Sequence, residues 1–277
     1  VLSKVDNIVD YLFVDCEKKS KNNSQGFFNI ERLATEVIKN CTLKYYKGND
    51  ITVDAIDNFV FNFFKAQGKL IGGLKILVIG LGNIGFKTSL KLLERGGEIR
   101  ILSSDNEKAK EIVSVINIIK PKETISSAEI FRIEKIDAFD CILFTGLAPK
   151  KSNTEVLQNF IKNSSLILDV GKGCLNKEQL ELLRIRNLIP YRLDVGDSLH
   201  AIIRQELTNQ NEFQIPRLKS ISQNLKLIEV GIVGEEGDVL MQNIDEINTI
   251  IGVCDGKGGL IQLNNNEKKN IIDRIKW

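Results

Sequence analysis

A glycine-rich turn between an expected strand and an expected helix constrains the fold of this chain more than any other feature. The strand is the apolar run 75–79, which leads directly into Gly80-Leu81-Gly82-Asn83-Ile84-Gly85. Helical spacing of apolar residues continues through Glu94, and a second apolar strand covers 98–102. Strand, glycine turn, helix and strand in this order predict the first βαβ unit of a parallel sheet.

Each glycine of the turn has a physical task in such a unit. Gly80 permits the tight turn out of the strand, Gly82 lets a pyrophosphate approach the backbone, and Gly85 lets the helix pack close to the sheet. The free N–H groups of the first helical turn, which include Asn83 and Ile84, then point at the phosphate oxygens. We therefore expect these five residues to bind a dinucleotide; the alternative is a glycine turn without a ligand.

The end of the second strand predicts which dinucleotide binds. An acidic residue there bonds the ribose of NAD, whereas small or basic residues admit the extra phosphate of NADP. The chain has Ser103-Ser104-Asp105 at this point. Asp105 either reads the ribose or caps the helix that follows, because Asp-Asn-Glu is a good helix start. The cofactor is therefore NAD or NADP, with a slight preference for NAD.

The chain continues as alternating strands and helices up to about residue 200. This alternation predicts an α/β fold with a doubly wound parallel Rossmann sheet. We expect three parts: a small α+β segment over 1–70, the dinucleotide-binding domain over 71–210, and a β-rich appendage over 211–277. The expected elements are strands at 10–16, 42–46, 140–145, 166–170 and 190–194, a loop at 18–25, helices at 29–40, 54–66, 107–115, 153–161, 176–186 and 201–208, and C-terminal strands at 226–233, 239–242, 249–254 and 260–263, while 123–127 is a short strand or an edge segment.

Residues 54–200 resemble the nucleotide-binding domain of the amino-acid-dehydrogenase-like NAD(P) enzymes. The turn is similar to the Gly-x-Gly-Asn-x-Gly turn of amino-acid dehydrogenases. Residues 103–109 occupy the place of the Asn-Arg-Thr-x-Glu-Lys-Ala run of shikimate dehydrogenases, without its basic residue. Residues 166–171 are similar to a strand end of methylene-tetrahydrofolate dehydrogenase, and 54–66 to the helix that connects two domains. The resemblance implies a Rossmann domain and a nicotinamide cofactor.

Ligands of an open α/β sheet bind beyond the carboxyl ends of its strands. Thr145 and Gly146 follow one such strand, and we expect them along the nicotinamide ribose; the alternative is a proline-terminated loop.

Four residues near the ends of the last two strands are candidates for proton handling. Asp169 and Asp194 each stand in a Leu-Asp-Val-Gly phrase, where they could accept protons or cap the following turn. Lys172, between two glycines, could polarise a carbonyl or be a solvated loop lysine. His200 is the single imidazole, and it could act as general acid or base or be an ordinary, partly buried histidine.

Composition excludes several classes of protein. The net charge of +2 and the scattered lysines do not indicate nucleic-acid binding. Five cysteines without CxxC spacing and a single histidine indicate a reducing compartment and no metal site. No run approaches the ~18 apolar residues of a membrane span, and no signal peptide opens the chain. We expect a cytoplasmic protein; the start at Val1 rather than methionine leaves room for a preceding segment.

These features predict an NAD(P)-dependent oxidoreductase that transfers a hydride between nicotinamide and a small polar metabolite. We expect it to form a homo-oligomer, with no nucleic-acid or membrane partner. The alternative is a relative of dehydrogenases that binds the dinucleotide without turnover, as a regulatory or structural protein. A third possibility is one subunit or domain of a larger enzyme.

Overall fold

The computed structural model describes residues 2–17, 19–22, 26–132, 138–146, 151–208, 215–222 and 225–275. The chain forms two compact units, 1–208 and 209–277. Their boundary lies close to the division expected at 210/211. The division expected at 70/71 does not separate compact units, because a helix that precedes it packs on the large sheet of the first unit.

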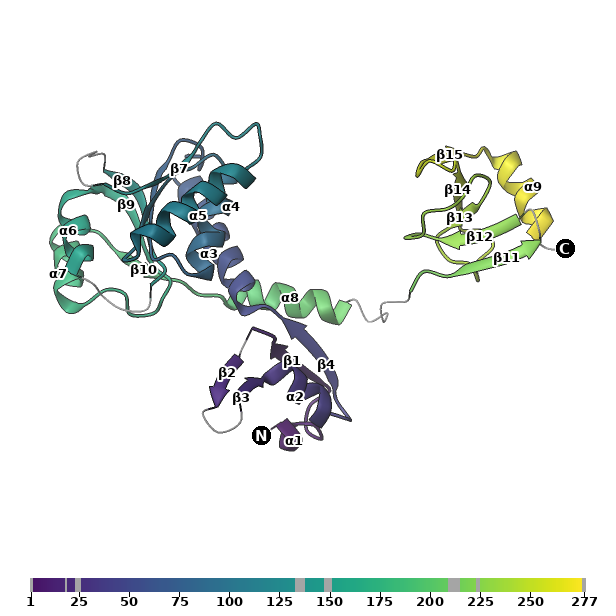
Figure 1. Ribbon diagram of the computed structural model, residues 1–277, viewed down its shortest axis with the longest axis horizontal. Helices are drawn as coiled ribbons and strands as arrows, with labels where there is room; N and C mark the ends of the chain where they lie inside the picture. The colour runs from purple at the N-terminus through teal and green to yellow at the C-terminus, as the bar shows by residue number, and fades with distance from the viewer. Residues whose placement is uncertain are drawn as a thin grey trace. The chain divides into compact units, whose positions relative to one another are not determined.

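The first unit is built on a six-stranded parallel sheet (Figure 1). Its spatial order is β10-β9-β8-β5-β6-β7, which is the Rossmann order 3-2-1-4-5-6 read from the opposite edge. This order confirms the expected doubly wound fold. The strands are β5 (Lys75–Ile79), β6 (Glu98–Leu102), β7 (Ala128–Ile130), β8 (Phe139–Phe144), β9 (Ile161–Asp169) and β10 (Pro190–Arg192).

Helices cover both faces of this sheet, as Figure 1 shows. Strand β5 is apolar throughout because its side chains alternate between two cores. Ile76 and Val78 pack in the core beneath one set of helices, and Leu77 and Ile79 pack in the other. The first set is α3 (Gly48–Lys65), α4 (Asn83–Glu94) and α5 (Asn106–Ile119), and the second is α6 (Lys151–Asn159) and α7 (Lys177–Ile185).

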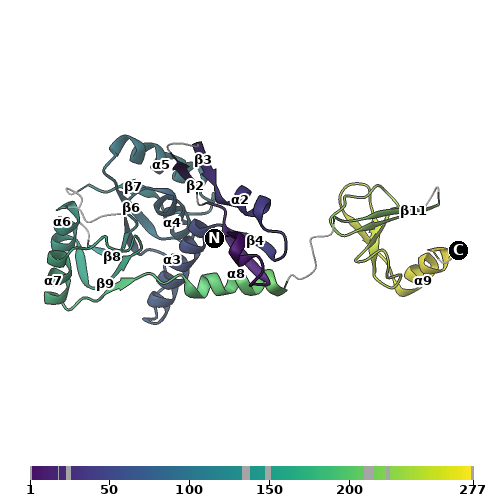
Figure 2. The ribbon, with the colours of Figure 1, turned by 90° about the horizontal axis from the view of Figure 1, so that it is seen from below.

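Helix α8 (Gly196–Thr208) follows the last strand and lies beside α3 (Figure 2). Near this contact, Tyr191 of β10 packs against Phe59 and Phe63 of α3, with ring centroids 5.5 and 5.7 Å apart. Helix α3 begins at Gly48, six residues before the expected start at 54, because the buried residues Ile51 and Val53 extend its apolar stripe by a turn.

The N-terminal part of this unit contains a parallel pair of strands joined through a helix. Asn29 caps that helix as expected, since its side chain accepts a hydrogen bond from the Glu31 N–H at 3.0 Å. The loop expected at 18–25 is wrong over Lys19–Asn22, which pairs with Gly26–Asn29 as a hairpin. The elements are α1 (Leu2–Val5), β1 (Tyr11–Asp15), β2 (Lys19–Asn22), β3 (Gly26–Asn29), α2 (Ile30–Val37) and β4 (Thr42–Tyr46).

The described part of the second unit is a five-stranded mixed sheet with one helix, and its strand order is β11-β12-β13-β14-β15. The expected β-rich appendage is confirmed, but its first strand and its helix were not expected. Both present polar or exposed residues, so their apolar periodicity is weak. The elements are β11 (Leu218–Ser222), β12 (Leu225–Glu229), β13 (Val239–Met241), β14 (Ile250–Cys254), β15 (Leu260–Gln262) and α9 (Asn265–Ile275).

One edge strand of the large sheet lies later than expected. The short segment expected at 123–127 is irregular, and the residues that pair with β6 are Ala128–Ile130.

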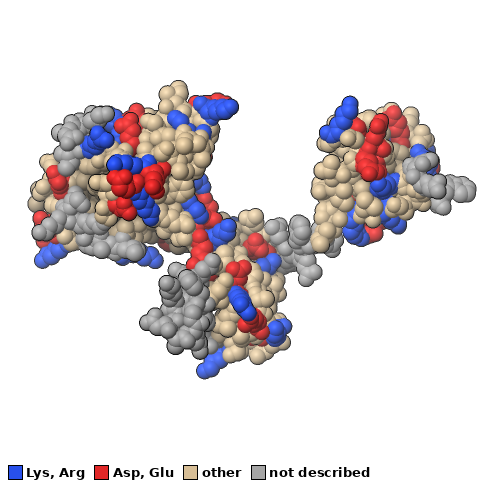
Figure 3. All heavy atoms as spheres, in the orientation of Figure 1, with Lys and Arg blue, Asp and Glu red and all other residues tan. Residues whose placement is uncertain are grey.

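On the face that Figure 3 shows, acidic and basic side chains are interspersed rather than separated by sign. Within the described ranges, no helix has the length and apolarity needed to cross a bilayer.

Candidate functional site

The turn between β5 and α4 needs glycine at two positions for the fold itself. Gly80 has φ 107°, and a Cβ there would lie 2.8 Å from the Gly146 nitrogen. A Cβ on Gly85 would lie 2.2 Å from the Gly80 carbonyl oxygen. These glycines therefore let α4 and the end of β8 approach the turn closely.

Gly82 differs from both, because the fold does not require it to be glycine. Its φ is −84°, which any residue adopts, and a Cβ there would meet nothing within 4 Å. It is the N-cap of α4 but supplies no side-chain cap, so the first N–H groups of the helix lack this partner. The missing side chain leaves open space above a helix N-terminus, where an anion binds favourably.

A cavity of about 510 Å³ opens beside this turn. This volume lies within the range of small-molecule sites. The cavity runs along the carboxyl ends of β6, β5 and β8, at the point where the strand order reverses. Its wall consists of Ile79, Gly80, Leu81, Gly82, Leu102, Ser103, Ser104, Asp105, Lys108, Phe144, Gly146, Asn153 and Cys174.

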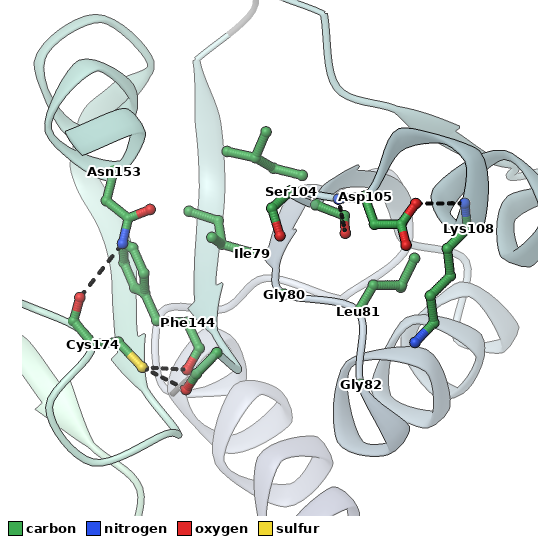
Figure 4. A pocket seen from close by; sticks show the side chains of 13 residues that line it. Ile79, Gly80, Leu81, Gly82, Ser104, Asp105, Lys108, Phe144, Asn153 and Cys174 are labelled. Atoms are coloured by element: carbon green, nitrogen blue, oxygen red, sulfur yellow. Dashed lines mark hydrogen bonds between the residues drawn. The ribbon is translucent and has the colours of Figure 1, made fainter. Parts of the chain in front are cut away.

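On one side the wall is polar (Figure 4). Asp105 caps helix α5: its Oδ1 accepts from the Lys108 N–H at 3.0 Å, and its own N–H donates to Ser103 Oγ at 3.2 Å. The capping alternative is thus confirmed. Because Asp105 also lines the cavity, a contact with a ribose stays compatible with this role.

The opposite side of the cavity combines Phe144 with two polar side chains (Figure 4). The Cys174 thiol donates to the Gly146 carbonyl at 2.9 Å, and burial, with nearby Asp169, raises its pKa to about 11. This thiol is therefore neutral at physiological pH, and it holds two loops together. Asn153 is 2% exposed, and its Nδ2 donates to the Cys174 carbonyl at 3.4 Å.

Six of the ten expected cofactor contacts line this cavity: Gly80, Gly82, Ser103, Ser104, Asp105 and Gly146. Asn83, Ile84 and Gly85 instead form the first turn of α4, outside the wall. Thr145 also lies outside it; its hydroxyl donates to the Gly80 carbonyl at 2.9 Å and ties β8 to the glycine turn. The loop residues 147–149 that follow lie outside the described residues.

Asp169 and Lys172 share one turn at the end of β9. Asp169 is 6% exposed, and its carboxylate accepts from the Gly173 N–H at 2.8 Å and the Cys174 N–H at 3.4 Å. Lys172 has φ 58° and is exposed. The geometry of Asp169 is that of a turn cap, which is one of the two interpretations its sequence position allows.

Asp194 and His200 lie beyond the end of β10. Because β10 pairs with β9, Asp169 and Asp194 follow neighbouring strands, as expected. Asp194 Oδ1 accepts from the Gly196 N–H at 2.9 Å, and the residue lines a second cavity of about 360 Å³ between α3 and α8. His200 is exposed on α8. None of the four candidates for proton handling lines the first cavity.

Sequence reasoning missed seven residues of the cavity wall: Ile79, Leu81, Leu102, Lys108, Phe144, Asn153 and Cys174. The sequence could have predicted several of them as wall residues, because they lie at the ends of strands or in the first turn of the helix that follows. Lys108 stands three residues after the N-cap Asp105. Asn153 had a similar signal, since it lies in the first turn of α6, which follows β8.

No protein-family model matches this chain, and no curated protein matches it. Solved structures similar to it include the A chain of dipicolinate synthase from Bacillus subtilis, with TM-score 0.40, 13% identity and coverage of 76% of this chain and 69% of that chain. L-tryptophan dehydrogenase from Nostoc punctiforme has TM-score 0.42 and 17% identity, over 64% of this chain and 50% of that chain. Shikimate dehydrogenase from Aquifex aeolicus has TM-score 0.39 and 14% identity, over 77% and 70%.

Proposed function

We propose that the chain binds NAD or NADP at the glycine turn and is an oxidoreductase that acts on a small polar metabolite. The observation that carries the proposal is Gly82. The fold does not need glycine there, yet the absent side chain leaves a space at a helix N-terminus beside a cavity of about 510 Å³. A pyrophosphate explains both the space and the free N–H groups.

The remaining wall residues fit the same ligand. Ser103, Ser104 and Asp105 stand where a Rossmann domain contacts the ribose of the adenosine half. Lys108 adds a cation to the same side of the cavity. Hydroxyl and carboxylate groups suit the ribose of NAD, whereas hydroxyl and ammonium groups suit the extra phosphate of NADP, so both cofactors belong to the proposal.

The bound cofactor would supply the hydride chemistry, and the chain would position it and the substrate. Three of the candidates for proton handling stay accessible, since Lys172, Asp194 and His200 are exposed. Asp169 is buried and would act by holding the turn that it shares with Lys172.

A second candidate function is dinucleotide binding without turnover. One observation favours it: the Asp169 carboxylate already accepts two backbone N–H groups. The absorbance of reduced nicotinamide, followed with a panel of hydroxy, oxo and amino metabolites, separates the two functions. It falls when NADH or NADPH reduces an oxo metabolite, and it rises when NAD or NADP oxidises a hydroxy or amino metabolite. A change with one metabolite supports the oxidoreductase, and binding without any change across the panel supports the second function.

Calorimetric titration with NAD, NADH, NADP and NADPH tests the binding itself. We expect Gly82→Ala to fold like the parent, because its Cβ meets no atom within 4 Å, and to bind more weakly. Gly82→Asp should abolish binding, since a carboxylate would occupy the phosphate position. Gly72→Asp is the matched control, because Gly72 is exposed and its Cβ would meet only the Arg95 carbonyl at 3.9 Å. Equal affinity of the parent and Gly82→Asp would overturn the proposal.

A further inference from the structure

An unpaired oxygen marks the wall of the cavity opposite Lys108. Asn153 Oδ1 is buried, and no donor in the described part of the chain reaches it. A buried polar atom without a hydrogen-bond partner lowers the stability of the folded protein, so its presence calls for an explanation. The Thr88 hydroxyl is also buried without a partner, but it lies outside the cavity wall. Asn153 is thus a residue of the cavity wall, whereas Thr88 is not.

Neighbouring contacts determine which atom of the Asn153 amide has no hydrogen-bond partner. The Cys174 carbonyl needs a donor, and Nδ2 supplies it at 3.4 Å. The turn that carries this carbonyl is itself held, because the Asp169 carboxylate accepts from the Gly173 and Cys174 N–H groups. A rotated amide would set two oxygens against each other. Oδ1 is thus the free end, and it requires an N–H or O–H donor.

The cavity lined by Asn153 is also lined by the residues that would contact the ribose of the adenosine half. Ser103, Ser104 and Asp105 line the same space (Figure 4). The base attached to that ribose must therefore occupy this cavity, and adenine carries an exocyclic amine with two donor hydrogens. Between the two polar sides the wall is apolar, formed by Ile79, Leu102 and Phe144, which suits the faces of a flat ring.

We propose that Asn153 Oδ1 accepts a hydrogen bond from the exocyclic amine of adenine, so that Asn153 makes this dinucleotide site selective for adenine over a 6-oxo purine. The inference rests on the proposed function, since it assigns a group of the same ligand. Hypoxanthine has the same shape but presents a carbonyl oxygen in place of the amine. Two acceptors would then face each other, and the buried oxygen of Asn153 would stay unpaired.

The test compares binding of NAD with binding of its hypoxanthine analogue by calorimetry, on the full chain. The parent should prefer the adenine form by about tenfold, the effect of one hydrogen bond to a buried group. Asn153→Leu keeps the volume but removes the amide, so it should bind both forms with similar affinity. Thr88→Val is the control for loss of a buried polar atom, and it should behave like the parent.

Each other outcome overturns a separate claim. A parent that binds neither dinucleotide overturns the proposed function. A parent that binds both forms equally, or an Asn153→Leu variant that keeps the tenfold preference, overturns the role of Asn153 and leaves the function standing. If Asn153→Leu weakens nicotinamide mononucleotide but not ADP-ribose, the oxygen faces the other base, and the adenine assignment is wrong.

Discussion

At the scale of single residues, Glu229 shows how a buried charge is held in the second unit. It is 8% exposed, and its Oε1 accepts from the Arg217 guanidinium at 2.7 Å and from the Ile244 N–H at 3.1 Å. The Arg217 N–H donates to Oε2 at 2.8 Å. These donors, with Arg217 first, lower the pKa of Glu229 from 4.5 to about 2. The carboxylate thus fastens the start of β11 to the turn after β13.

This lowered pKa predicts an acid-sensitive second unit. Because the pKa is lower in the folded state, the stabilisation is fully present above pH 4.5 and is lost as the pH falls through about 2. Glu229→Gln should be less stable at neutral pH and should lose less stability over that interval. Amide signals of β12, β13 and β14, followed by NMR against pH, measure the effect. Glu236→Gln changes an exposed side chain and should titrate like the parent; an unchanged profile in Glu229→Gln would contradict the prediction.

The sequence predicts single residues best where local backbone chemistry determines their role. Gly80, Gly85 and Asp105 are examples: the first two are needed by the turn, and the third caps the helix that its own neighbours begin. Asn153 lies at the other extreme. Its role depends on the turn after β9, which is 21 residues away in the chain, and no local pattern reports that approach.

At the scale of elements, a row of ion pairs joins α3 to α4, and Lys91 lies within reach of both Asp54 and Asp57. Asp50 pairs with Lys87, Asp54 with Lys91, and Asp57 with Arg95. The pairs recur at helical spacing on both helices, so the two helices run side by side in the same direction. The first two acids are about half exposed, whereas the Asp57 side chain is 5% exposed, and Arg95 Nη2 donates to its Oδ2 at 2.7 Å.

Burial predicts that these three pairs contribute unequally to stability. Asp57→Ala should lower the free energy of unfolding by about 2–3 kcal/mol, because it removes a paired, buried carboxylate and leaves Arg95 without its partner. Asp50→Ala and Asp54→Ala should each cost less than about 1 kcal/mol, as exposed ion pairs do. Urea denaturation of the three variants measures the difference. A cost for Asp50→Ala equal to that for Asp57→Ala would show that burial does not set the ranking.

Apolar patterning explains which elements the sequence predicts. Strands β5, β8 and β9 each contain a buried run, because they are covered on both faces, and these runs follow from the sequence. Strand β9 begins at Ile161, five residues before the expected start at 166, because residues 162–164 are polar and give no apolar signal. Helix α9 was missed because only Ile271, Ile272 and Ile275 pack against the core of its unit, among polar neighbours. Edge strands such as β7 and β11 are short or exposed, and their boundaries depend on pairing rather than on composition.

At the scale of the whole molecule, each unit has cores of its own. The first contains the two clusters on either face of the parallel sheet, and the second contains two smaller clusters around its mixed sheet. Every residue of the cavity wall belongs to the first unit. Dinucleotide binding is therefore expected to be a property of that unit alone.

Two truncations test this expectation. Fragment 1–208 should fold and bind the dinucleotide with the affinity of the full chain, and fragment 209–277 should not bind. Fragment 71–208 should fail to fold, although it contains every strand of the parallel sheet, because it lacks Ile56, Val60 and Phe64 of α3. These side chains are 0–1% exposed in the core beneath α4 and α5, and without them that face of the sheet would be open to water. Circular dichroism and calorimetry measure folding and binding; a folded 71–208 fragment that binds would show that α3 is dispensable.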